Sequence, residues 1–280
     1  MPSLIRPPGL PCLEEFPLAL LDRRVGTDDR IRTFESGSTT PGSTRKRLTM
    51  KAGPSDRLPT SGDLTVFLSL VKLWREAGRP RSFKFTNYQL AMACTGRGDR
   101  GNIYARIRSS IERWRNTEFD YEEESYSVDG STLVRKKFRI LSGPPAAKEL
   151  AWSDLVNRCL QLPPWPQLDL SAAVKLAPAP RQLFFFLSGW LQLSGSGKIP
   201  LARLAYDHMG LSRSLVVGDL KRSVGRGAIE LERVGVIKKL EIAKRFLKDA
   251  KGQWSVVFEL LPRENNGPSI KEPDMSPSRN

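Results

Sequence analysis

Apolar residues recur at the three- and four-residue spacing of a helix in several segments, and strand-like alternation lies between them. From residue 64 to residue 74 they form one stripe behind Asp63, a residue type that favours helix N-caps, so a buried helix is predicted there. An alternating strand is predicted at residues 81–86, and Thr86 then caps a second helix that ends at Gly96. A globular domain therefore begins near residue 61.

A third helix is predicted in the stretch GNIYARIRSSIERWRN, because an apolar stripe runs along it from Ile103 through Ile107 to Trp114. Two β-rich runs follow around Asp129-Gly130, the dipeptide most typical of a tight hairpin turn. The predicted order is therefore helix, strand, helix, helix, hairpin.

The same order repeats in the second half of the chain. A Pro-rich connector leads to the apolar helix RQLFFFLSGWLQL, a short strand KIPL and a helix that ends at Gly210. A longer helix is predicted at about residues 214–234, followed by a second hairpin. Gly210 follows Gly96 at nearly the same offset as Trp190 follows Trp74, so the sequence indicates a tandem duplication of one module.

Residues 1–60 carry Pro, Gly, Ser and Thr in clusters without a sustained helix or strand period, so most of this segment is expected to be disordered. A short apolar patch at residues 16–21 is expected to dock. The basic run Arg45, Lys46 and Arg47 favours a solvated tail over an arm that contacts DNA. The predicted division is a basic, disordered N-terminal tail (1–60), a first domain (61–143), a Pro-rich connector with a short helix (144–180), a second domain (181–262) and a disordered C-terminal tail (263–280).

The charge of the chain indicates a polyanionic partner. Its 280 residues include 45 Lys+Arg and 30 Asp+Glu, which gives a formal net charge of +15 at pH 7 and a pI near 10.0. No apolar run reaches the roughly 18 residues that a membrane helix needs, and prolines interrupt the N-terminus where a signal peptide needs an apolar core. We therefore expect a cytoplasmic protein that binds nucleic acid and no membrane.

The cysteine and histidine content argues against metal and cofactor chemistry. Three widely spaced cysteines, Cys12, Cys94 and Cys159, fit neither a disulfide framework nor a metal knuckle. His208 is the single histidine, whereas a structural zinc site takes several His or Cys ligands. Reduced thiols, no metal and no cofactor are therefore expected.

The polar faces of the two longer helices are basic. Two short helices, of which the second presents basic and small polar side chains before a hairpin, are typical of a winged helix on DNA. The major groove accepts one such helix, and the hairpin grips the flanking backbone. The sequence thus predicts an α+β fold with two tandem winged-helix domains. The candidate DNA-binding residues are Arg100, Asn102, Arg106, Ser109, Arg113, Arg135, Lys136, Arg213, Ser214, Lys221, Arg222 and Arg226.

Two stretches resemble a known family. They are residues 83–119, FKFTNYQLAMACTGRGDRGNIYARIRSSIERWRNTEF, and residues 152–190, with Leu-Asp-Leu at 168–170 and Arg-x-Leu-Phe-x-Phe-Leu at 181–187. Both are similar to bacterial plasmid replication initiator proteins of the replication initiator A type. The similarity spans about residues 60–262, mostly as hydrophobic pattern. The Pro-rich PPWPQ insertion and the long N-terminal segment depart from the family pattern.

The resemblance implies a tandem winged-helix protein that initiates plasmid replication by binding repeated sites in double-stranded DNA at the origin. It also implies that the protein helps to load the host replication machinery, with the host initiator and the replicative helicase as partners. In such families one winged helix mediates a homodimer, and the monomer is commonly the initiating form.

The residues alone leave other functions open. A plasmid or phage transcriptional regulator with two winged helices and no role in origin opening has the same features. An RNA-binding or scaffold protein is disfavoured because the stacked-aromatic signature of single-strand RNA modules is missing. An enzyme is not expected, since a rolling-circle nickase needs paired histidines, no arrangement of a tyrosine recombinase can be read, and no GxxxxGK[ST] phosphate loop occurs.

Overall fold

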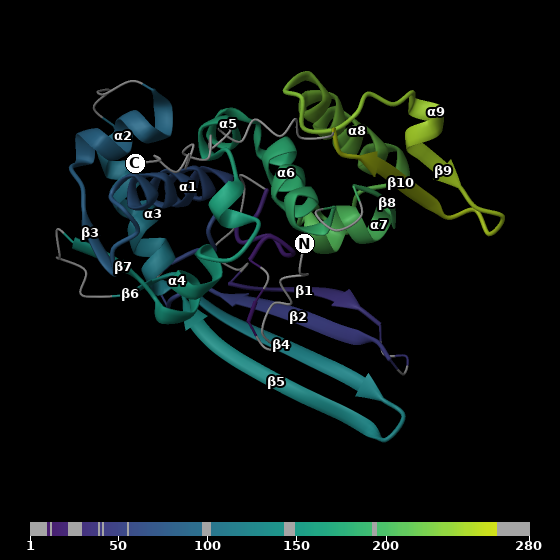
Figure 1. Ribbon diagram of the computed structural model, residues 1–280, viewed down its shortest axis with the longest axis horizontal. Coiled ribbons are helices and arrows are strands. Elements are labelled where there is room, and N and C mark those ends of the chain that lie inside the picture. Colours follow the sequence, from purple (N-terminus) through teal and green to yellow (C-terminus); the bar gives the residue numbers. More distant parts are fainter. Residues whose placement is uncertain are drawn as a thin grey trace, which may run out of the picture.

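The computed structural model describes residues 10–11, 13–21, 30–38, 40, 42–54, 56–96, 102–142, 149–191 and 195–261. In chain order the elements are β1 (Ile31–Gly37), β2 (Thr44–Lys51), α1 (Ser61–Glu76), β3 (Ser82–Lys84), α2 (Asn87–Thr95), α3 (Ile103–Asn116), β4 (Glu118–Ser127), β5 (Gly130–Arg139), β6 (Leu141–Ser142), β7 (Glu149–Trp152), α4 (Asp154–Leu160), η1 (Trp165–Gln167), α5 (Leu170–Lys175), α6 (Pro178–Trp190), β8 (Ser196–Pro200), α7 (Leu201–Arg203), η2 (Leu204–His208), α8 (Val217–Arg233), α9 (Ile242–Arg245), β9 (Phe246–Lys248) and β10 (Trp254–Glu259). We define the N-terminal part of the molecule as β1 to α5 and the C-terminal part as α6 to β10 (Figure 1).

Each part contains a small antiparallel sheet with the same strand order. The sheet of the N-terminal part is β3-β7-β6 and that of the C-terminal part is β8-β10-β9, so the last strand in sequence lies in the middle of both. A first helix precedes each sheet, α1 or α6, and helical elements separate its first strand from its hairpin: α2 and α3 in the N-terminal part, and α7 with η2, α8 and the short α9 in the C-terminal part. The predicted repeat of helix, strand, helix, helix and hairpin is therefore present in the structure.

The hairpin around Asp129-Gly130 is an addition to that repeat. Strands β4 and β5 form it as predicted, although its turn residues are Val128 and Asp129 and Gly130 already pairs with Ser127. It stands between α3 and β6, and its strands pair with β2 and not with β3. The hairpin that corresponds to β9–β10 is therefore β6–β7. The chain passes from β5 to β6 through Ile140, which is fully buried.

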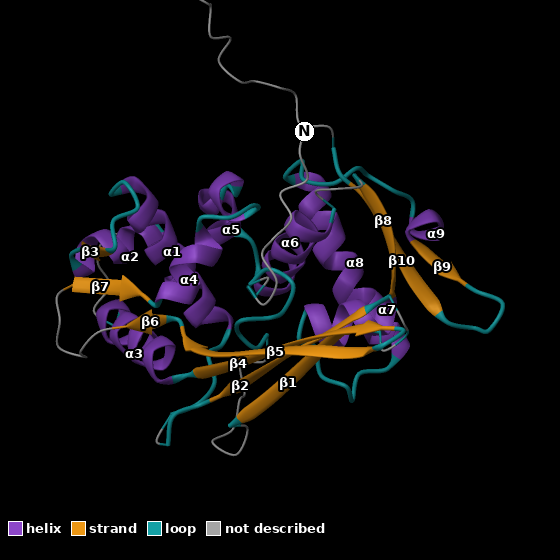
Figure 2. Ribbon diagram, turned by 60° about the horizontal axis from the view of Figure 1, so that its bottom comes forward, coloured by secondary structure: helices purple, strands orange, loops and turns teal. Residues whose placement is uncertain are grey.

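A four-stranded antiparallel sheet, β1-β2-β4-β5, includes the segment that was expected to be a disordered tail. β2 pairs with β4 from Thr44 to Lys51, and β1 pairs with β2 along its whole length. Figure 2 views this sheet nearly edge-on, with α6 and α8 on one side of it. The inner face is apolar and buried: it carries Phe34, Leu48, Met50, Phe119 and Tyr121.

The outer face of this sheet explains why its sequence resembles a tail. Glu35 accepts from Arg45 and Arg47 at 2.9 Å each, and Arg47 also lies 3.3 Å from Glu122 on β4. The basic run is thus paired with carboxylates on neighbouring strands, and the expectation of a solvated tail is wrong for it. The composition of residues 44–51 alone does not indicate that carboxylates of β4 pair with this run.

Residues 10–11 and 13–21 also pack into the molecule. Leu10, Leu13, Phe16 and Leu20 are buried in the core, so the expected docking of residues 16–21 is confirmed and extends further toward the N-terminus. The N–H of Leu20 donates to the carbonyl of Pro59 at 2.8 Å, just before α1. The expectation of disorder is therefore wrong here too, because the apolar side chains gain a core to bury in.

The segment predicted as a connector contributes to the core. Its strand β7 completes the sheet of the N-terminal part, so the predicted boundary at residue 143 falls between two strands of one hairpin. Trp165 of η1 is buried between Phe67 of α1 and Phe185 of α6, with ring centroids 5.9 and 5.5 Å away. The C-terminal tail, 263–280, lies outside the described residues.

The helix ends follow from local chemistry. α1 begins one turn earlier than predicted, because Thr60 is its N-cap and Asp63 is the third helical residue of a capping box. α2 is capped by Thr86 and ends at Gly96, which has a φ of 68°, as predicted. α8 packs closely on α6, where a Cβ on Gly227 would lie 3.3 Å from Leu183.

Candidate nucleic-acid interface

Helix α3 presents one polar face to solvent. Ile107 and Trp114 are buried on its other face, and the indole N–H of Trp114 donates to the carbonyl of Asp63 at 2.9 Å. Asn102, Arg106 and Ser109 are exposed, as their helical phase predicts. Arg100 lies outside the described residues.

Arg113 does not belong to that exposed face. Its guanidinium lies 2.6 Å from the Asp63 carboxylate, and the two side chains are only 13% and 3% exposed. Asp63 also accepts the Thr60 N–H of the α1 capping box at 2.7 Å. The helical wheel placed Arg113 opposite the apolar stripe, but a carboxylate from another helix draws it inward, so its role is to hold α3 on α1.

The helical phase places Arg108 on a flank of the polar face, and it was not among the candidate DNA-binding residues. It is exposed, and no salt bridge to it or to Arg106 occurs within the described part of the chain. Arg108 lies on the flank of the polar face between Ala105 and Glu112. Including the arginines on the flanks of the polar face, in addition to those directly opposite the apolar stripe, would have identified it.

Helix α8 presents a second basic face. Leu220, Val224 and Leu231 are buried against the C-terminal core. Arg222 and Arg226, four residues apart, point away from it. Arg222 lies 3.1 Å from Asp219 one turn earlier and is still 64% exposed. For Arg226 no salt bridge occurs among the described residues.

Lys221 packs on the neighbouring hairpin. Its ammonium lies 3.5 Å from the ring centroid of Trp254 on β10 and 5.3 Å from that of Phe246 on β9. The side chain is half-buried. This cation–π contact fixes the hairpin β9–β10 against α8, which a sequence pattern alone could not indicate.

Arg213 and Ser214 lie in the turn that precedes α8. The Arg213 guanidinium is 72% exposed, lies 2.9 Å from Asp207 and stands over the Tyr206 ring at 5.5 Å. Burial raises the pKa of the Asp207 carboxyl, against the opposing effect of Arg213. The Ser214 hydroxyl is 2.8 Å from that of Ser212.

Arg135 and Lys136 lie on β5 of the added hairpin, and not on the hairpin β6–β7 that corresponds to β9–β10. Arg135 binds the Asp120 carboxylate through two nitrogens, and this pairing raises the pKa of the guanidinium. Lys136 is exposed and pairs with Tyr121, so its side chain lies on the same sheet face as Tyr121 and on the opposite face from Arg135. Their predicted place in a first wing is therefore wrong, and their contact with DNA stays a prediction.

A membrane-spanning helix and a metal-ligand cluster are both absent from the described part of the chain. No helix there is long and apolar enough to cross a membrane. No group of three or more His, Cys, Asp or Glu side chains is placed there to hold a metal ion.

No protein-family model matches the chain, and no curated protein sequence matches it significantly. Two crystal structures of RctB match its fold. A structure of domains 2 and 3 of RctB aligns with a TM-score of 0.55 at 17% identity, covering 86% of this chain and 94% of the other. A second RctB structure of domains 2–3 aligns with a TM-score of 0.55 at 16% identity, covering 90% and 97%. The chain has the fold of RctB domains 2 and 3.

Proposed function

We propose that this protein initiates replication of a plasmid by binding repeated sites in double-stranded DNA at the origin. The observation that carries the proposal is the fold likeness to domains 2 and 3 of RctB, a replication initiator, over 86 to 90% of the chain. The net charge of +15 and the exposed arginines of α3 and α8 support a polyanionic partner.

Each part of the molecule acts as a winged helix in this proposal. The sheets β3-β7-β6 and β8-β10-β9 share one order, and each is completed after a helix whose exposed face is basic. A helix of this kind enters the major groove, and the hairpin after it lies along the flanking backbone. The wings are then β6–β7 and β9–β10.

The proposed DNA contacts follow from exposure. Asn102, Arg106 and Ser109 of α3 are available for the first groove, together with Arg108. Arg222 and Arg226 of α8, with Arg213 and Ser214 before it, are available for the second. The chain acts by binding and is not an enzyme. The host initiator, the replicative helicase and a second copy of the chain are its proposed partners.

The test is to recover the DNA that the purified protein retains at about 150 mM salt, close to physiological ionic strength. The input is fragments of its own replicon and genome. A cluster of direct repeats beside an AT-rich stretch is expected. A single promoter palindrome would instead indicate a transcriptional regulator without a role in origin opening. No enrichment over bulk DNA would overturn both.

A matched variant separates specific from general binding. Replacing Arg222 and Arg226 with Ala removes two exposed cations of α8, while replacing the exposed Arg158 and Lys175 removes two cations elsewhere. Enrichment of the repeats is expected to be lost in the first variant and kept in the second. Equal loss in both would show that net charge alone retained the DNA.

A further inference from the structure

One short segment contacts both parts of the molecule. Residues 13–20, which we call the strap, run between them. The Glu14 carboxylate accepts from the indole N–H of Trp165 at 3.1 Å in the N-terminal part. On the other side it lies so close to α6 that a Cβ on Gly189 would be 2.5 Å from its Cγ. A glycine at 189 therefore makes room for the strap.

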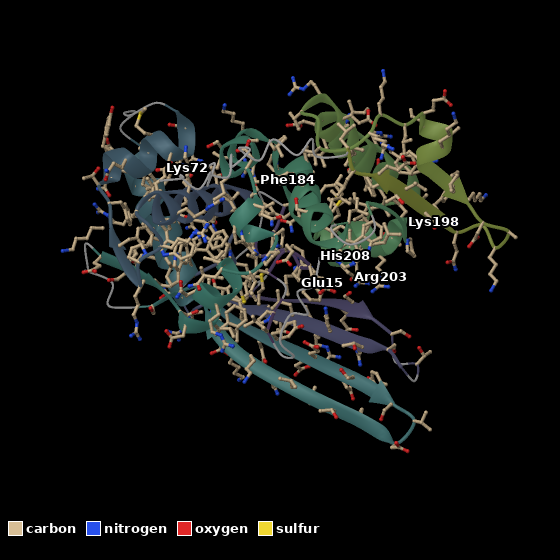
Figure 3. The ribbon with its side chains drawn as sticks, viewed as in Figure 1. Glu15, Lys72, Phe184, Lys198, Arg203 and His208 are labelled. Carbon is tan, nitrogen blue, oxygen red and sulfur yellow. The ribbon has the colours of Figure 1, made fainter. Side chains whose placement is uncertain are left out.

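The next residue of the strap joins the two parts through polar contacts. The Glu15 carboxylate accepts from Ser36 of β1 at 2.7 Å and from Lys46 of β2 at 2.8 Å. Its backbone carbonyl is 2.7 Å from Nδ1 of His208, at the end of η2. Arg203 of α7 donates directly to Ser36 at 3.0 Å. These five residues are the junction cluster; Figure 3 labels Glu15, Arg203 and His208 close together.

The junction cluster is largely shielded from water. His208 is 3% exposed, and its ring stacks on Phe186 at 4.2 Å and on Phe16 of the strap at 6.4 Å. The Lys46 and Glu15 side chains are 25% and 18% exposed. In such surroundings a charge that loses its partner is costly, so the cluster favours one arrangement of its five residues.

A second contact between the parts lies elsewhere. Arg181 of α6 donates to the Ser61 carbonyl at 3.3 Å and to the Thr65 hydroxyl at 2.6 Å, both on α1. This contact involves no residue of the junction cluster, so we expect it to keep α6 on α1 in a variant in which the cluster is broken.

We propose that the junction cluster fixes the orientation of the C-terminal part relative to the N-terminal part, and so sets the spacing at which α3 and α8 meet DNA. The second half of this statement rests on the proposed function. None of the five residues lies on the exposed faces of α3 or α8, so they act as positioning residues.

The first experiment uses no DNA. Spin labels on Ser109→Cys of α3 and Arg226→Cys of α8, in the full chain with Cys12 and Cys94 replaced by Ser, report the distance between the two helices. Glu15→Gln removes the charge that Lys46 pairs with. Arg45→Met is the control, because it also removes an ion pair of β2, the one with Glu35, but on the sheet face opposite to Lys46. The Glu15 variant is expected to give a distance distribution about twice as wide as that of the control.

An unchanged distribution in a folded Glu15→Gln variant would overturn the proposal. Should that variant not fold, as judged by thermal unfolding, Arg203→Met replaces it, since it removes the direct bond to Ser36 and leaves the Glu15–Lys46 pair in place. A distribution identical to that of the control would again contradict the proposal.

The second experiment tests the spacing. About five base pairs, half a helical turn, are inserted between the two contacted segments of the enriched DNA. The parent chain and Arg45→Met are expected to lose affinity at least about tenfold, and Glu15→Gln less than about threefold. Equal losses would refute the spacing role. A parent chain that binds no DNA would instead overturn the proposed function, while the label distances still decide whether the cluster sets the orientation.

Discussion

Arg181 is a buried cation that connects the two parts through several hydrogen bonds. It is 5% exposed, and besides its two contacts on α1 it donates to the carbonyls of Ala173, Val174 and Leu176 at 2.7 to 3.0 Å. These carbonyls end α5, where unpaired oxygens and the helix dipole favour a cation. Burial lowers the pKa of the guanidinium, against the attraction of Glu230.

Replacing Arg181 with Met is therefore expected to lower the free energy of unfolding by about 2 to 4 kcal/mol, because several buried carbonyls lose their donor at once. Urea denaturation measures it. Lys is expected to rescue little, since one ammonium cannot reproduce the planar fork. Arg158→Met, at an exposed site on α4, is the control and should change stability by less than about 0.5 kcal/mol. A change of less than about 0.5 kcal/mol in Arg181→Met as well would show that Arg181 does not stabilise the contact between the two parts.

His208 makes stability depend on pH. Burial lowers its pKa to about 4, assisted by Arg203 and Lys46 and opposed by the hydrogen bond and charge of Glu15. The unfolded chain titrates at about 6.5, so between these values it binds a proton that the folded chain does not. Stability is therefore lost as the pH falls through this window.

Between about pH 6.5 and 5 the expected loss is about 1.5 kcal/mol, measured by urea denaturation at each pH. His208 is the single histidine of the sequence, so no other side chain with an ordinary pKa titrates there. His208→Asn keeps a donor for the Glu15 carbonyl and does not titrate, and it should remove the slope. The same slope in that variant would exclude His208 as its source.

Below about pH 4.5 the Glu15 carboxyl also contributes to the loss of stability. Burial alone would raise its pKa, but Lys46 and Ser36 hold the pKa below its usual value. The unfolded chain therefore takes up a proton at a higher pH than the folded chain, which lowers stability as the pH falls.

At the scale of elements, the arginines of α3 and α8 divide into structural and exposed ones. Arg113→Ala leaves Asp63 buried without its partner, so it should cost about 3 to 5 kcal/mol of stability. Arg222→Ala with Arg226→Ala should leave stability within about 0.5 kcal/mol and weaken binding to the enriched repeats by about 1 to 3 kcal/mol for each base-reading arginine. Thermal unfolding and fluorescence anisotropy with labelled DNA measure the two effects. Unchanged affinity in the double variant would remove α8 from the interface.

The helices could be predicted from sequence because their signals are local. Thr86 and Gly96 bound α2 through their own backbone and side-chain preferences, and the stripe through Ile107 and Trp114 buries one face of α3. The candidate site was placed by the same helical phase. That phase failed at Arg113, where a carboxylate from another helix decided the position of the side chain.

The strands that were missed depend on distant partners. β2 reads as a polar, basic segment until Glu122 and Tyr121 of β4 lie beside it, one pairing with its charges and the other covering Leu48. β6 and β7 have only two and four residues, so their alternation is too short to recognise in the sequence. The longer hairpin β4–β5 was therefore interpreted as the wing. Both errors arise because pairing across a sheet is not encoded in neighbouring residues.

At the scale of the whole molecule, the four-stranded sheet carries a cluster of paired charges. The outer face of β1-β2-β4-β5 is a ladder of paired charges, where Glu35, Asp120 and Glu122 bind Arg45, Arg47 and Arg135. Paired cations attract phosphates weakly, because the nearby carboxylates cancel their field. Arg106, Arg108 and Arg226 of α3 and α8 form no salt bridge among the described residues, so in the proposed complex they attract phosphates more strongly than this ladder does.

This distribution predicts the salt dependence of binding. If each part neutralises roughly four phosphates, the slope of log K against log salt concentration should be on the order of −7. Titrations of the enriched DNA between about 50 and 200 mM salt measure it. If both arginines contact phosphates, Arg222→Ala with Arg226→Ala should reduce the magnitude by about 2, because each lost phosphate contact releases about one counterion less.

Two variants with the same loss of net charge distinguish contact from general attraction. Arg158→Ala with Lys175→Ala removes exposed cations of α4 and α5, and Arg135→Ala with Lys137→Ala removes cations that pair with Glu118, Asp120 and Glu122. Both should leave the slope within about 0.5 of the parent, because neither pair touches phosphate in the proposed complex. A slope reduced by about 2 in the second variant would place the long hairpin β4–β5 on DNA and return Arg135 to the interface.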